Sequence, residues 1–185
     1  MARAGQVITN LATGEHVHFR QTKAETGGAF LEFELRLDPG GVVGGLPHKH
    51  LVAERFTVLD GQLAAWTPMG RRDLGPGDTI VVPSRMSHYV FNPGAAMLAT
   101  VVVEPADDFE TFLETTFALQ TARRFKVWRG LPGPLQGALL SVTYDVYGAL
   151  LPIPLQRPAF EPLAEIARRR GIPAALTNSP VQAAS

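Results

Sequence analysis

Three histidines and one glutamate are spaced in a way that suits a metal site. His48 and His50 flank Lys49, Glu54 follows four residues after His50, and His88 lies further along the chain. Imidazole nitrogen and carboxylate oxygen are ligands that suit divalent zinc, iron, nickel or manganese. Because the chain contains no cysteine, thiolate ligands are excluded. These residues therefore predict a metal centre built from nitrogen and oxygen.

Strand periodicity can bring the four side chains together. Side chains alternate between the two faces of a strand, so His48 and His50 share a face while Lys49 points away. Glu54 is an even number of residues from His50 and keeps that face if the strand continues. A later strand that carries His88 can lie beside the first one in a closed sheet. We therefore expect one divalent metal ion per chain, held by three imidazoles and one carboxylate.

The chemistry expected of such a centre is that of an open coordination site. A six-coordinate ion with four protein ligands keeps about two positions for water, substrate or oxygen. One carboxylate against a divalent cation leaves a net positive charge, which favours carboxylates, phenolates or enolates as ligands. The ion can act as a Lewis acid, or activate oxygen if it is redox-active. Glu54 can also leave the ion and serve as a catalytic base, and the sequence offers no other dedicated base.

The segments around these residues predict short strands up to about residue 105. Residues 29–37 alternate between apolar and charged side chains, which is typical of a half-buried strand. Asp60-Gly61 is a hairpin signal, and Gly- and Pro-rich turns recur at short intervals. Many short strands separated by close turns indicate a sandwich or a barrel. Further strands are predicted at 54–59, 62–66, 79–82, 87–91 and 97–103.

Helical periodicity replaces the strand pattern after Pro105. Asp107 is the predicted cap of a first helix, and a second pattern begins near Leu135 and runs through Tyr144, Asp145, Val146 and Tyr147. A third helix is predicted from Pro158 to Arg170, with Gly171 as its stop. One side of the first helix is formed by Phe109, Phe112, Leu113, Thr116, Phe117 and Gln120.

The sequence thus predicts a mainly β domain with a helical extension. We expect a barrel over residues 1–105, a helical C-terminal extension over 106–176 and a flexible tail over 177–185. Three amphipathic helices are marginally stable alone. The extension is therefore expected to pack on the barrel or on a partner subunit.

The motif residues resemble those of the cupin superfamily. Valine stands at position 42 and arginine at position 85, where the family has glycine. The resemblance covers roughly residues 30–105 and implies a mainly β fold, a double-stranded β-helix or jelly-roll barrel, with C-terminal α-helices here. It also implies a metal near the barrel mouth, held by the three histidines and Glu54, and a homodimer. The first motif is matched by His48, His50, Glu54 and Gly61, and the second by Gly77, Pro83, His88 and Asn92.

The composition of the chain excludes some classes of partner. The chain has 185 residues, of which 45% are apolar, and its 17 basic residues balance 17 acidic ones. A net charge of zero argues against nucleic acid as a partner. The most apolar stretch, residues 137–155, contains an aspartate and two prolines, so no membrane partner is expected. The absence of cysteine and of a secretory signal pattern favours the cytoplasm.

Several residues can be interpreted either as ordinary structural residues or as functional ones. His16 and His18 repeat the spacing of a ligand pair but lack a third histidine and a glutamate, so we expect an ordinary strand. Asn92 is expected to form a turn, and Arg85 to be solvated rather than to hold an anionic substrate. Tyr144 and Tyr147 can face the barrel mouth, although nothing in the sequence requires it.

The resemblance to cupins implies two main classes of function. The first is a metal-dependent enzyme acting on a small organic molecule, either a dioxygenase with a redox-active metal or an isomerase or lyase with zinc or manganese. The second is a non-catalytic module that binds or senses a small molecule.

Overall fold

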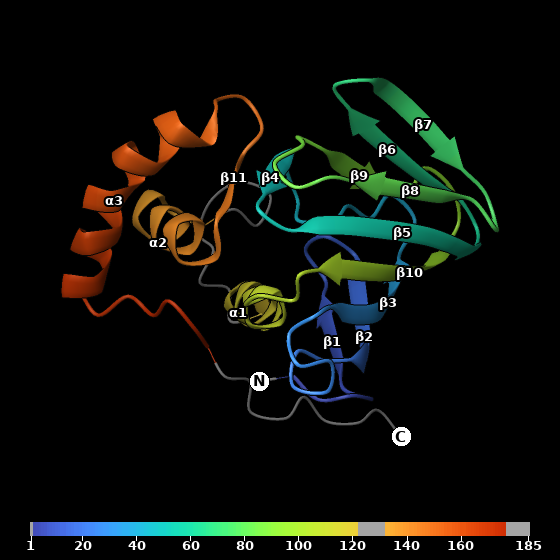
Figure 1. Cartoon of the computed structure of the whole chain (residues 1–185), viewed down its shortest axis with the longest axis horizontal. Helices are drawn as coiled ribbons and strands as arrows, with labels where there is room; N and C mark the ends of the chain where they lie inside the picture. The colour runs from blue at the N-terminus through green and yellow to red at the C-terminus, as the bar shows by residue number, and fades with distance from the viewer. Residues whose placement is uncertain (1, 122–131, 177–185) are drawn as a thin grey trace.

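A barrel of short antiparallel strands precedes the helices, as predicted (Figure 1). The structure is a computed structural model that describes residues 2–121 and 132–176, so the tail predicted for 177–185 lies outside the described residues. The strands of the barrel are β1 (Val7–Asn10), β2 (Glu15–Gln21), β3 (Leu31–Leu37), β4 (His48–His50), β5 (Ala53–Asp60), β6 (Leu63–Thr67), β7 (Gly70–Leu74), β8 (Thr79–Val82), β9 (Tyr89–Phe91) and β10 (Met97–Glu104).

The strands form two layers. The larger sheet has the order β1-β2-β3-β10-β5-β8, with every neighbouring pair antiparallel. The other layer contains β7-β6-β9 and the pair that β11 (Val146–Gly148) forms with β4. An isolated bridge between His48 and His88 connects the two. This bridge places β4 beside the start of β9, so histidines from distant segments become neighbours.

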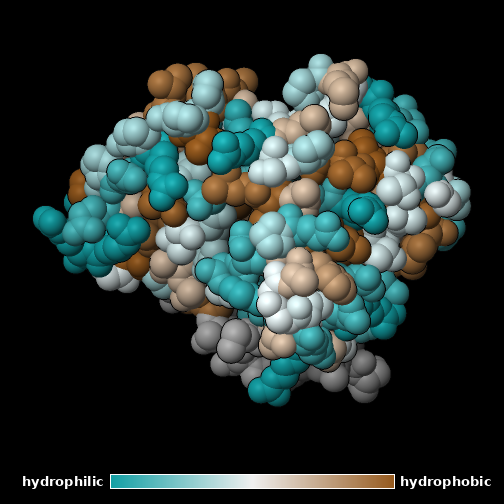
Figure 2. All heavy atoms as spheres, viewed as in Figure 1, coloured by the Kyte–Doolittle hydropathy of each residue, from teal (hydrophilic) through white to brown (hydrophobic). Residues whose placement is uncertain are grey.

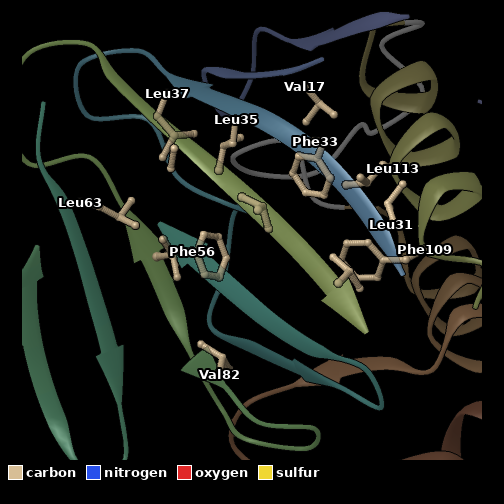
Figure 3. Close-up of a cluster of buried hydrophobic side chains, with 14 of the residues drawn as sticks. Val17, Leu31, Phe33, Leu35, Leu37, Phe56, Leu63, Val82, Phe109 and Leu113 are labelled. Atoms are coloured by element: carbon tan, nitrogen blue, oxygen red, sulfur yellow. The ribbon is translucent and has the colours of Figure 1, made fainter. Parts of the chain in front are cut away.

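The barrel core lies between the two layers. The apolar face predicted for residues 29–37 is buried along β3, and Leu35, Phe56 and Leu63 belong to one buried cluster (Figure 3). Residues of β10 such as Val101 complete this cluster from the centre of the larger sheet. Burial of these side chains supplies the main driving force for the barrel.

The first helix, α1 (Phe109–Thr121), packs on this core. Phe109, Leu113 and Phe117 belong to the same buried cluster as the barrel strands. The backbone of Asp108, rather than that of Asp107, accepts the first helical hydrogen bond, from Phe112 N. The cap predicted at Asp107 was therefore one residue too early.

The second helical prediction was wrong at its end. Helix α2 (Pro134–Tyr144) stops at Asp145, whose φ of 53° is left-handed, and β11 (Val146–Gly148) follows. Val146 and Tyr147 are therefore strand residues. Their backbone pairs with β4, an interaction between distant segments that local periodicity does not reveal.

The third helix begins earlier than predicted. Helix α3 (Ile153–Arg169) starts five residues before Pro158 and includes Pro154 in its first turn. Proline fits there because the first N–H groups of a helix have no partner within the helix. Helices α2 and α3 share a smaller buried cluster, formed by Leu139, Ala164 and Ala167. Among the described residues, no helix is long and apolar enough to cross a membrane.

Candidate metal centre

The structure brings the four predicted ligand residues together. His48 and His50 lie on β4, and His88 lies just before β9. His48 and His88 exchange two backbone hydrogen bonds, of 3.0 and 2.9 Å. Glu54 is the second residue of β5 and is placed between Val103 of β10 and Val82 of β8.

The expected continuous strand from His50 to Glu54 does not form. Residues 51 and 52 make a bend between β4 and β5. Two contacts hold this bend, because Arg85 N donates to His50 O at 2.7 Å and Ser84 Oγ donates to Leu51 O at 2.5 Å. Glu54 reaches the histidines from the neighbouring sheet instead of from an extension of β4.

The ligand atoms converge on one point. One ring nitrogen from each of His48, His50 and His88 lies within 4.8 Å of the other two. Oε2 of Glu54 is 3.2 Å from Nε2 of His50 and 3.2 Å from Nε2 of His88. Ligand atoms that are each about 2.1 Å from one ion are about 3.0 to 3.4 Å apart at coordination angles between 90° and tetrahedral. The Glu54 distances fall in this range.

Hydrogen bonds orient all three imidazoles in the same way. Nδ1 of His48 lies 2.8 Å from the carbonyl oxygen of Leu46, and Nδ1 of His50 lies 2.9 Å from that of Val52. Nδ1 of His88 lies 3.0 Å from the carbonyl of Met86. A carbonyl only accepts, so each Nδ1 carries the proton and each Nε2 of a neutral ring presents a lone pair.

Three atoms at the centre have no hydrogen-bond partner. Nε2 of His50, Nε2 of His88 and Oε2 of Glu54 are fully buried and unsatisfied. Buried polar atoms normally find a partner, and leaving one without is costly. A divalent cation among the four side chains would satisfy all three atoms, so the donor set and its arrangement fit a metal ion.

The charges at the centre also suit a cation. Burial raises the pKa of Glu54, but attraction by His50 and His88, each 3.2 Å away, outweighs burial and holds that pKa well below its usual range. Desolvation, followed by the charges of His88 and His50, lowers the pKa of His48 to about 3. Glu54 is therefore an anion and His48 a neutral ring at physiological pH, which are the forms that bind a metal. Burial lowers the pKa of His88, but the nearby Glu54 outweighs burial and raises that pKa, so a metal ion would compete with a proton for this ring.

A cavity of about 180 Å³ adjoins the centre. His48 and Glu54 line it, together with barrel side chains such as Phe33 and Phe56. The predicted side of α1 faces this cavity in full, and Leu140 of α2 adds to the wall. The side of α1 consists of Phe109, Phe112, Leu113, Thr116, Phe117 and Gln120, and the resulting space is mostly apolar.

Glu15 is a cavity residue that the sequence patterns above did not identify as a candidate. Glu15 lies on β2, is buried and lines the same cavity as His48 and Glu54. Its strand carried a signal, since Glu15 shares a face with the apolar Val17 and Phe19. A carboxylate on an inward apolar face is the pattern that could have identified it.

The remaining candidates have structural contacts. His16 is 3.0 Å from Asp38 and His18 is 3.5 Å from Glu34, so the predicted ordinary strand is observed there. Asn92 is buried and donates from Nδ2 to the backbone carbonyls of Leu37 and Asp38, at 3.1 and 3.0 Å.

Arg85 and the two tyrosines also lie apart from the cavity. Arg85 is exposed, as predicted. Tyr147 is buried on β11 and pairs with Lys49 of β4, while Tyr144 Oη contacts Thr115 and Ala174. None of these residues lines the cavity that His48 and Glu54 share, although Tyr144 lines a second cavity together with the ligand residue His50.

Comparisons with solved structures give distant matches. A sugar phosphate isomerase of the cupin superfamily from Silicibacter pomeroyi is 25% identical, over 55% of this chain and 69% of that chain, with a TM-score of 0.44. KdgF from Halomonas sp. is 20% identical over 56% of this chain and 89% of that chain, with a TM-score of 0.49. An RmlC-like cupin from Shewanella frigidimarina is 19% identical over 59% and 94%, also with a TM-score of 0.49.

Comparison by sequence identifies a family. No curated protein sequence matches the chain. The family model described as a cupin domain matches residues 33–104, which include all four residues of the candidate metal centre. The barrel, its motif residues and this match agree, and residues 33–104 of the chain form a cupin domain.

Proposed function

We propose that this protein is a metal-dependent enzyme that acts on a small organic anion. The metal would be one divalent ion held by His48, His50, Glu54 and His88. The observation that carries the proposal is the set of three buried, unsatisfied ligand atoms that face one another beside a cavity. Perturbed titratable groups beside a cavity are typical of functional sites.

The donor set admits several metals. Three imidazoles and one carboxylate suit zinc, iron, nickel or manganese. When bound, zinc or manganese would supply Lewis acidity for isomerase or lyase chemistry, and iron or nickel would also allow dioxygenase chemistry. The apolar cavity walls would exclude water from the bound molecule. The second role predicted for Glu54, as a base, is less favoured, because its lowered pKa makes it a weak proton acceptor.

Metal analysis of natively purified protein tests the centre. We expect about one divalent ion per chain in the wild type and a loss of most of it in His50→Ala. His18→Ala is the matched control, because His18 belongs to the other histidine pair and faces Glu34. Equal metal content in the wild type and His50→Ala would contradict the proposed ligand set.

A sensing function is the second candidate, and one contact favours it. Strand β11, from the helical extension, pairs directly with β4, which carries two of the ligands. A molecule bound at the centre can therefore bias the position of α2 and α3. Ligand-dependent thermal stabilisation without any turnover would support sensing over catalysis.

We also propose a cytoplasmic homodimer. The absence of cysteine supports the compartment. Apolar side chains gather over the loop between β11 and α3 and over the start of α3, where Leu150, Leu151 and Leu155 are exposed (Figure 2). Exposed apolar patches often mark interfaces, which supports a second copy as the partner. Light scattering would measure the mass against the 20.0 kDa of one chain.

A further inference from the structure

Glu15 is a buried carboxyl that the metal centre does not use. Its residue is 3% exposed. Thr13 Oγ1 lies 2.5 Å from Oε2, Gly44 N donates to Oε1 at 3.3 Å, and Asn10 Nδ2 donates to Oε2 at 3.5 Å. Among the described residues, no lysine, arginine or histidine forms an ion pair with Glu15. A buried carboxylate without a cationic partner is unfavourable, which favours the neutral acid.

The same loop residue contacts Glu15 and approaches the metal centre. The amide of Gly44 reaches Oε1 of Glu15, and a Cβ built on Gly44 would lie 2.9 Å from Cε1 of His48. Glu15, Gly44, His48 and Glu54 line one cavity. A molecule that occupies this cavity therefore meets the carboxyl of Glu15 as well as the metal ligands.

The surroundings of Glu15 accommodate both protonation states. The hydroxyl of Thr13 can donate to a carboxylate or to the carbonyl oxygen of the neutral acid, so the proton of the acid is left to point at a bound molecule. Burial raises the pKa of Glu15 to about 7, with a smaller contribution from the charge on Glu54, against the opposing hydrogen bonds from Thr13, Gly44 and Asn10. The only other titratable residues that line the described cavity are His48 from β4 and Glu54 from β5, and α1 and α2 contribute none.

We propose that neutral Glu15 donates a hydrogen bond to an anionic oxygen of the bound molecule. The occupant would be a small monocarboxylate with an apolar body. Its oxygen atoms would lie toward Glu15 and the positively charged metal centre, and its body would contact the aromatic walls. The proton stays on Glu15, so the interaction is lost when Glu15 ionises and repels the anion. This inference rests on the proposed function for the metal centre, and it adds the class of molecule and a second recognition group.

The test measures carboxylate binding as a function of pH. Zinc-loaded protein is titrated with butyrate and with benzoate by calorimetry at pH 6 and at pH 8.5. The wild type should bind roughly 30-fold more weakly at pH 8.5, because only the neutral form of Glu15 accepts the anion. In Glu15→Gln the amide donates at both pH values, so most of this difference should disappear. Glu161→Gln, on the exposed surface of α3, should behave as the wild type.

Two results would overturn the inference. One is that neither carboxylate binds the zinc-loaded wild type at pH 6. The other is that carboxylate binding by Glu15→Gln keeps the full pH dependence of the wild type. The pH dependence would then arise at the metal centre and not at Glu15. Zinc content is measured first on every variant. A wild type that takes up no zinc contradicts the proposed function, whereas normal zinc content with either of the two results contradicts only the role of Glu15.

Stability gives a readout that needs no ligand. A folded-state pKa of about 7 for Glu15 exceeds the unfolded value of about 4.3, so the folded state binds more protons between these pH values. The unfolding free energy of the wild type should therefore fall, relative to Glu15→Gln, as the pH rises from about 4.3 to about 7. Parallel pH profiles of the two proteins in urea would show that Glu15 titrates normally and would contradict the neutral acid.

Discussion

At the scale of single residues, Arg85 shows that a departure from a motif can leave the backbone unchanged. This arginine stands where the cupin pattern has glycine, and its φ is 67°. The left-handed region is unfavourable for a residue with a Cβ and accessible to glycine. The turn nevertheless forms, because Arg85 N donates to the carbonyl oxygen of His50 at 2.7 Å. The motif position therefore keeps its conformation at a cost in stability.

Replacing this arginine by glycine should stabilise the protein. We expect Arg85→Gly to raise the unfolding free energy by about 1 kcal/mol, measured by urea denaturation, with unchanged metal content. Arg85→Ala is the control, because it removes the long side chain and keeps the backbone strain. An equal gain in Arg85→Ala would assign the effect to the side chain and not to φ.

At the scale of elements, the loop before β4 controls the position of His48. Gly44 and Gly45 both have positive φ, of 67° and 79°. A Cβ on Gly44 would lie 2.9 Å from the His48 ring, whereas a Cβ on Gly45 would meet only Thr13, at 3.6 Å. The two positions share the same backbone constraint, but only Gly44 approaches a ligand residue.

This difference allows a matched test of the loop. Gly44→Ala should displace the His48 ring and reduce zinc affinity by at least about ten-fold, a size typical of disturbing groups that orient a ligand. Gly45→Ala should lose similar stability without that loss of affinity. Competition with a zinc-chelating dye measures both variants. Equal zinc affinities for the two would exclude the proposed contact between Gly44 and His48.

The elements also show which features the sequence could predict. The shared side of the α1 residues depends on local spacing and was predicted from it. The spacing also pointed to the four residues that the structure brings together, whereas their role as metal ligands stays a prediction. Strand β11 was missed because its three residues are stable only through pairing with β4, about 100 residues away. The start of α3 was missed because a proline such as Pro154 usually interrupts a helix, whereas here it occupies the first turn. Glu15 was missed because its place beside Gly44 and the cavity depends on the fold, which brings together residues 29 positions apart.

At the scale of the whole molecule, most buried apolar side chains of residues 2–121 and 132–176 belong to one of two clusters of unequal size. The larger cluster joins both layers of the barrel with α1, and the smaller one joins α2 and α3 through Leu139, Ala164 and Ala167. Regions with few buried apolar contacts open at a lower free energy than the core. The α2–α3 pair should therefore open without unfolding of the barrel.

Native-state hydrogen exchange can measure this difference. Backbone amides within α2 and α3 should exchange at least about ten-fold faster than those in the central strands β3 and β10. Leu139→Ala should widen the gap by destabilising the smaller cluster, while β10 keeps its exchange rates. Equal protection of α3 and β10 would mean that the described chain unfolds as a single cooperative unit.

The pairing of β11 with β4 has a consequence for association between molecules. A strand with an unpaired edge presents a row of backbone donors and acceptors to any other extended chain. Strand β4 carries His48 and His50, so an open edge there would expose the ligand strand to pairing with a foreign strand. Residues 146–148 occupy that edge within the same chain. The helical extension thus protects the ligand strand against aggregation.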